Sequence, residues 1–181
     1  MSGKIISLDN FRNKKEPESD DLNELLIKAH KLRGRIPKSD EMVWQDFGNL
    51  KGLFETRLNE LLLDNRFIGA NIFLCSSYIA ILLAKFATKN PESWYATDYA
   101  IKGYESRDPF VLQNGADVCF ILCTLYPERC NRRSMKKSDY VSLGSGLYHR
   151  FYNQTGREIG YYMGDLFELM SEVTAECVKS L

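Results

Sequence analysis

The chain has no excess of charge of either sign. Its 181 residues contain 24 basic and 24 acidic side chains, so the formal net charge at pH 7 is zero. A strongly basic chain would favour nucleic acid or an anionic membrane as its partner, and this chain lacks that global attraction. Glycine and proline are also few, with 12 and 5 residues. The length and composition are those of a single globular domain.

Signatures of common catalytic sites are absent as well. The sequence contains no Gly-x-Ser-x-Gly, no Gly-x-x-x-x-Gly-Lys and no Rossmann glycine fingerprint, so no hydrolase elbow or phosphate-binding loop is indicated. No Glu-x-x-His pair occurs, which argues against a di-iron site in a helical bundle. We therefore expect a protein without cofactor or metal, and an enzyme only of an unrecognised type.

We expect no secretory signal, because residues 4–10 are too short and too polar for the apolar segment of one. We therefore expect the reducing cytoplasm and buried free thiols for the five cysteines, which are Cys75, Cys119, Cys123, Cys130 and Cys177. Cys119 and Cys123 stand one helical turn apart with Cys130 nearby, but neither histidine lies at a recognised spacing for zinc. Core packing is the simpler interpretation of these cysteines.

The longest apolar run is Phe67–Ala87, and it is apolar on nearly every side. A helix of this kind belongs either in a protein core or in a bilayer. Its length is close to the lower limit for a membrane span, about 20 residues. Because it contains Asn71, Ser76 and Ser77 and has few flanking basic residues, we expect a buried core helix and no membrane span. A membrane span is the alternative.

Apolar residues recur at helical spacing through most of the chain, and we find no convincing strand pattern beyond residues 4–8. Asn90-Pro91 and Asp108-Pro109 have the sequence of a helix cap followed by proline. Thr155 and Glu158 have the spacing of a capping box. The predicted helices are 20–33, 40–65, 67–88, 90–103, 109–125, 139–154 and 155–179.

These segments predict an all-α fold, an irregular or orthogonal bundle of six to seven helices around a buried central helix at about 67–88. We expect a single helical domain over residues 20–181. Residues 1–19 would form a flexible N-terminal tail, because a polar stretch follows their few apolar side chains.

Three features inside the predicted core are candidates for a special role. Asp117 lies in an otherwise apolar helix, so we expect a buried carboxylate paired with an arginine or a tyrosine. His149 could line a cleft, but a surface or interface position is the simpler expectation. Gly156, Gly160 and Gly164 recur at every fourth residue, which favours a close crossing with another helix.

Two charged groups of residues are candidates for an interaction surface. The first is the basic connector, with Arg129, Arg132, Arg133, Lys136 and Lys137. The second is the acidic row of the last predicted helix, with Asp165, Glu168, Glu172 and Glu176. Like charges at such spacing repel, so the acidic row suggests that something basic lies over it. Cations from the connector, from a second copy or from another protein could provide this.

The C-terminal third resembles a group of uncharacterised, all-helical proteobacterial hypothetical proteins. The segments that carry this resemblance are LYPERCNRR at 125–133, DYVSLGSGLYHRF at 139–151 and DLFEL at 165–169. Leu147 stands where the group's pattern has alanine, and Val141 where it has a second tyrosine. The resemblance implies a bacterial helical protein, with no known activity and no site residues.

The function that the sequence favours is a non-catalytic helical interaction protein, an adaptor or regulator of the bacterial cytoplasm. Its partner would be another protein or a second copy of the chain. The first alternative is a nucleic-acid-binding protein that uses the basic connector at 129–137, although zero net charge argues against it. The second alternative is an enzyme with Asp117, His149 or a tyrosine in a cleft.

Overall fold

The structure is a computed structural model that describes residues 40–130 and 135–180, with side chains from Phe47 onward. The predicted tail at 1–19 and the predicted helix at 20–33 lie outside these residues. The described part has no strand, which confirms the all-α class. Its helices are α2 (Asp40–Asp64), α3 (Ala70–Thr88), α4 (Ala96–Ser106), α5 (Pro109–Leu125), α6 (Pro127–Cys130), α7 (Lys137–Thr155), α8 (Glu158–Asp165) and α9 (Phe167–Lys179).

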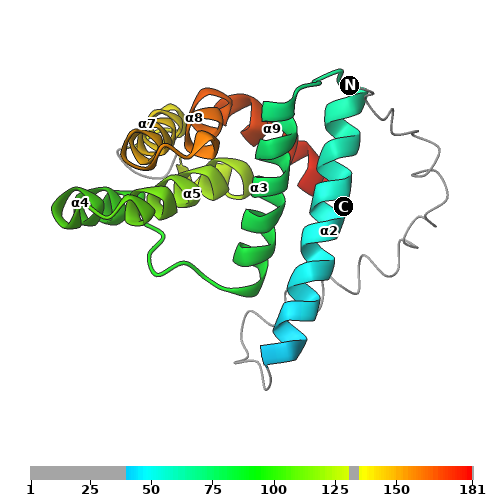
Figure 1. Cartoon of the computed structure of the whole chain (residues 1–181), viewed down its shortest axis with the longest axis horizontal. Coiled ribbons are helices and arrows are strands. Elements are labelled where there is room, and N and C mark those ends of the chain that lie inside the picture. The colour runs from blue at the N-terminus through cyan, green and yellow to red at the C-terminus, as the bar shows by residue number, and fades with distance from the viewer. Residues whose placement is uncertain (1–39, 131–134, 181) are drawn as a thin grey trace, which may run out of the picture.

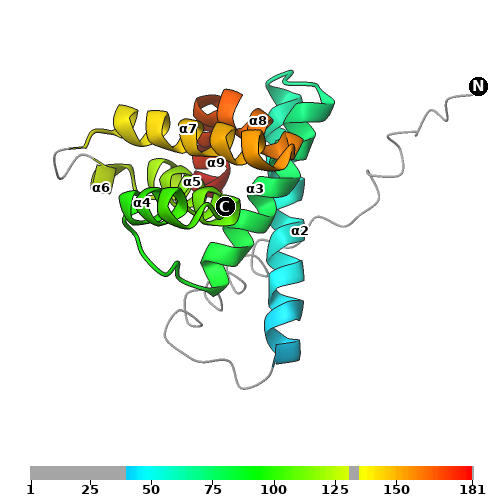
Figure 2. The same ribbon diagram turned by 60° about the vertical axis from the view of Figure 1, so that its left-hand side comes forward.

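The helices α2 and α3 form an antiparallel pair, joined by a turn at residues 65–69 (Figure 1). The turn begins where the side chain of Asn65 donates to the carbonyl oxygen of Leu61 at 2.8 Å, and Arg66 has the left-handed φ of 60°. The first turns of α2 project beyond the other helices (Figure 2). Its inner side chains repeat at every fourth residue and are Leu50, Phe54, Leu58 and Leu62.

The most enclosed helix is α5, which packs against α4, α6, α7 and α9. Eleven of its 17 residues are buried, against eight of the 19 in α3. The helix expected at 67–88 is therefore present as α3, but α5 occupies the centre of the core. The reason is that neighbouring helices cover only one side of α3.

The start of α5 follows the prediction, whereas the start of α4 does not. The carboxylate of Asp108 accepts from the backbone N–H of Phe110 at 2.9 Å, and Pro109 is the first residue of α5. The prediction of a helix from Asn90-Pro91 is wrong, because α4 begins only at Ala96. There the Ser93 hydroxyl accepts from the backbone N–H of Tyr95, so a local turn replaces the expected first turn of helix.

The predicted last helix at 155–179 is two helices, α8 and α9, separated at Leu166. The ψ of Leu166 is 11° instead of the usual helical value near −42°, which changes the chain direction. The predicted capping box is also wrong, because Thr155 is the last residue of α7 and its hydroxyl donates to the carbonyl oxygen of Phe151 at 2.7 Å. Because of this division and the short α6, the number of described helices is higher than the predicted six to seven.

By length and composition, one described helix could cross a membrane, namely α3. In the structure, 44% of its apolar window is buried against other helices. The core helix of a soluble protein passes the same test, so the expectation of no membrane span stays a prediction.

Candidate functional site

Asp117 lies at the junction of three helices and accepts two hydrogen bonds from tyrosines. The Tyr78 hydroxyl of α3 donates to its Oδ1 at 2.6 Å, and the Tyr148 hydroxyl of α7 donates to the same atom at 2.7 Å. The amide of Gln113 in turn donates to the Tyr78 hydroxyl at 2.8 Å. The predicted pairing of Asp117 with a tyrosine is confirmed. The identity and number of the tyrosines could not be predicted, because they come from distant segments.

Burial sets the electrostatics of this cluster. Desolvation raises the pKa of Asp117, although the hydrogen bonds from both phenols and the charge of Lys85 act in the opposite direction. Burial also raises the pKa values of Tyr78 and Tyr148, with a further contribution from the neighbouring carboxylate. The cluster therefore holds α3, α5 and α7 together through neutral phenols.

The glycines predicted at a close crossing have two different roles. A Cβ on Gly160 would lie 2.8 Å from the backbone oxygen of Tyr148, and one on Gly164 would lie 2.7 Å from the ring of His149. These two glycines confirm a close approach, with α7 as the neighbouring helix. Gly156 instead has a φ of 68° at the C-terminal end of α7, where glycine is favoured because it has no Cβ.

His149 lies on the outer side of this crossing. Its Nε2 lies 3.3 Å from Oδ1 of Asp165, which follows on α8. The carboxylate of Asp165 also raises the pKa of the Tyr161 phenol. His149 is therefore at the surface, as expected, and Asp165, which was predicted as part of the acidic row, lies on α8 beside it.

A groove of about 520 Å³ runs over the exposed side of α7, with Tyr104 of α4 along one wall. The guanidinium of Arg150 lies 4.2 Å from the centroid of the Tyr104 ring. One of its nitrogens also donates to the Tyr104 hydroxyl at 3.1 Å. The remaining lining residues are Ser142, Leu143, Gly146, Leu147, His149, Asn153 and Gln154. Sequence reasoning missed this groove, because its two walls are far apart in the chain.

The charged groups predicted as an interaction surface are exposed wherever the structure describes them. Glu168, Glu172 and Glu176 lie on the outside of α9, and Arg129 lies 4.9 Å from the ring centroid of Tyr126. Arg132 and Arg133 lie outside the described residues. Among the described ones, no salt bridge joins the acids to Arg129, Lys136 or Lys137. Their proposed interaction role therefore stays a prediction.

The five cysteines are free thiols and are all buried. Burial raises the pKa of Cys123 to about 12 and that of Cys177 to about 11, so these thiols are neutral near pH 7. Within residues 40–130 and 135–180, no three metal-ligating side chains form a cluster. The packing interpretation therefore agrees with the burial of Cys119, Cys123 and Cys130.

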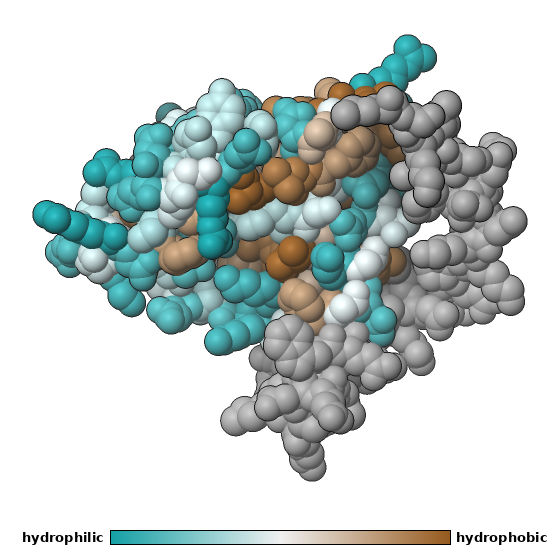
Figure 3. Space-filling view, viewed as in Figure 1, coloured by the Kyte–Doolittle hydropathy of each residue, from teal (hydrophilic) through white to brown (hydrophobic). Residues whose placement is uncertain are grey.

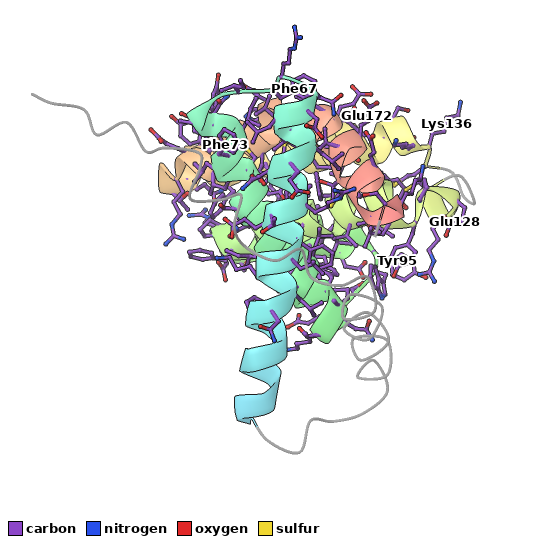
Figure 4. The ribbon with its side chains drawn as sticks, turned by 90° about the vertical axis from the view of Figure 1, so that its right-hand side faces the viewer. Phe67, Phe73, Tyr95, Glu128, Lys136 and Glu172 are labelled. Carbon is purple, nitrogen blue, oxygen red and sulfur yellow. The ribbon has the colours of Figure 1, made fainter. Side chains whose placement is uncertain are left out.

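One side of α3 carries apolar residues that no described helix covers. We call it the α3 face and define it as the exposed residues Ala70, Leu74 and Ile81 of α3, together with Ile68 just before the helix and the half-buried Ser77, which binds α2. Ile68 is 72% exposed, Leu74 43% and Ile81 42%. Figure 3 shows apolar side chains gathered across this side of the molecule, where α3 runs in Figure 1. Phe73, labelled in Figure 4, borders the α3 face.

The one signal in the sequence for the α3 face is the excess of apolar residues in the segment that forms α3. A helix that is apolar all round has more apolar surface than one core can cover, but the sequence does not say which side remains open. No protein-family model, curated protein or solved structure matches the chain.

Proposed function

We propose that the chain is a non-catalytic helical interaction protein, an adaptor or regulator of the bacterial cytoplasm. The observation that carries this proposal is the α3 face. Exposed apolar residues that gather along one helix mark interaction sites more often than isolated ones do. The groove over α7 is lined by His149 and Tyr104 but not by Asp117. The enzyme alternative therefore rests on His149 and Tyr104, and no observation in the described residues favours it over the interaction protein.

The spacing of the α3 face favours a helix as its occupant. Ala70, Leu74, Ser77 and Ile81 follow one another in steps of four, three and four residues. Steps of this kind place side chains on one seam, into which the side chains of another helix insert. The Ser77 hydroxyl is already bound to Glu55 of α2, so covering it would leave no unpaired hydroxyl.

We propose that a second copy of this chain covers the α3 face, because the two copies of the seam can pack against each other. A twofold axis near Ser77 would place Leu74 of one copy against Ile81 of the other, with the smaller serines between them. The two copies of Lys85 would lie about 22 Å apart, at 1.5 Å of rise per residue. That distance exceeds a Debye length of about 10 Å, so the two charges would hardly repel.

The test is the mass of the purified chain in solution. We expect a dimer by light scattering at high protein concentration, and a monomer after Ile81→Glu, because an unpaired carboxylate would enter the apolar seam. The far-UV circular dichroism should stay unchanged, since Ile81 is exposed in the single chain.

The matched control is Ile101→Glu, which places the same charge at an apolar residue of another helix, α4, that is 60% exposed. It should remain dimeric. A wild type that is monomeric at every concentration would refute the second copy as occupant. Wild-type protein that needs detergent or sediments with phosphatidylcholine vesicles would instead support the membrane alternative.

The nucleic-acid alternative depends on the basic connector, of which the described part offers Arg129, Lys136 and Lys137. It requires a gel shift with DNA or RNA at low salt that Arg132→Glu with Arg133→Glu abolishes. No observation in the described residues favours it over the interaction protein.

A further inference from the structure

The groove over α7 contains a cation that is held in place but not neutralised. Arg150 donates to the Tyr104 hydroxyl and lies on the Tyr104 ring, so its guanidinium is fixed by two contacts. In the part of the chain that the structure describes, no carboxylate lies within 4.0 Å of it. Arginine held in this way retains free N–H donors whose fork fits the two oxygens of a carboxylate.

Gly146 keeps the floor of this groove low. It is exposed in the middle of α7, and a Cβ built on it would meet nothing within 4 Å. Glycine inside a helix costs about 1 kcal/mol relative to alanine, and no close neighbour in the described residues explains this cost. Gly144, two residues earlier in α7, differs because a Cβ there would meet Cys119 at 2.8 Å.

The groove has the length and the polar lining of a peptide site. Its lining runs from Ser142 to Gln154, which spans about 18 Å at 1.5 Å per residue. An extended peptide of about five residues covers the same distance. Ser142, Asn153 and Gln154 offer hydroxyl and amide groups that can bind a peptide backbone.

We infer that this groove binds an extended acidic peptide segment, with a carboxylate of the peptide on Arg150 and its backbone passing over Gly146. A nucleic acid fits less well, because several cations usually follow a phosphate backbone. Among the described residues that line the groove, His149 is the one other basic side chain beside Arg150, and it already faces Asp165. The inference is independent of the α3 face, which lies on another helix.

The experiment measures binding of fluorescein-labelled pentaglutamate to the full chain by fluorescence anisotropy at low salt. We expect saturable binding that weakens as salt rises. Arg150→Gln should weaken binding about tenfold or more, the equivalent of losing one charged hydrogen bond. Gly146→Leu should weaken it similarly, because a leucine side chain would occupy the floor while keeping good helix propensity.

Two matched controls separate this site from general effects of charge and shape. Arg157→Gln removes another arginine that lies on an aromatic ring, that of Phe110, but does not line the groove. Gly52→Leu adds the same side chain at an open glycine of α2. Both should bind pentaglutamate as the wild type does.

Three results would overturn the inference. One is equal binding of labelled pentaglutamine, which would make the carboxylates irrelevant. Another is unchanged binding by Arg150→Gln or by Gly146→Leu. The third is tighter binding of a labelled oligothymidylate that also depends on Arg150, because the groove would then be a site for phosphates. None of these outcomes depends on whether the chain is a dimer.

Discussion

Asp117 shows how burial and hydrogen bonding oppose each other at a single residue. Two phenols donate to its Oδ1, which favours the charged form, while desolvation favours the neutral form and is the larger effect. The pKa of Asp117 in the folded chain therefore lies above the ordinary value of 3.8. Between these two pKa values the folded chain holds more protons than the unfolded chain, so stability falls as pH rises.

The first prediction follows from this sign. Asp117→Asn keeps an oxygen that accepts from Tyr78 and Tyr148 but has no proton to lose. We therefore compare the free energies of unfolding of the wild type and this variant. The difference, wild type minus variant, should fall as pH rises from about 4, and it should become constant above the pKa that Asp117 has in the folded chain. Urea unfolding at a series of pH values measures it. A difference for Asp117→Asn that is flat over the whole series would contradict the assignment.

At the scale of the elements, the crossing of α7 and α8 depends on glycines in close contact. The second prediction compares Gly160→Ala with Gly146→Ala. A Cβ on Gly160 would lie 2.8 Å from Phe151 Cδ1 and 2.8 Å from the Tyr148 carbonyl oxygen, so the helices must separate. We expect a loss of about 1–3 kcal/mol despite the better helix propensity. Gly146→Ala has open space and should gain about 1 kcal/mol.

Thermal unfolding of these two variants measures the difference, and the melting temperatures should move in opposite directions. A raised melting temperature for Gly160→Ala would mean that the two helices do not approach as closely as the structure has them.

At the scale of the whole molecule, the α3 face is the surface whose partner matters most. If a second copy covers it, folding and association are coupled, and the stability depends on protein concentration. The third prediction is that the melting temperature of the wild type rises over a roughly hundredfold increase in concentration. That of Ile81→Glu should stay constant. Scanning calorimetry at several concentrations measures both, and parallel behaviour of the two proteins would argue against pairing through α3.

Local features of the sequence were enough for several correct predictions. The all-α class follows from helical periodicity, and the start of α5 follows from Asp108-Pro109. That Asp117 pairs with an arginine or a tyrosine follows from the cost of an unpaired buried carboxylate. The start of α4 was wrong because Asn90-Pro91 has the same local pattern as Asp108-Pro109, and only the hydrogen bonds of Ser93 distinguish them.

The sequence by itself determined that the chain folds into helices with a large apolar surplus at residues 67–88, because periodicity and burial costs act along the chain. Only the tertiary structure decided that α5 is at the centre, that the α3 face stays open and that Arg150 lies on Tyr104 beside a groove. These features join segments that are far apart in the chain, such as α4 with α7. Which helices become neighbours depends on how all the helices pack together. The hydrophobic pattern of one segment shows that it has an apolar side but does not identify the helix that will cover it.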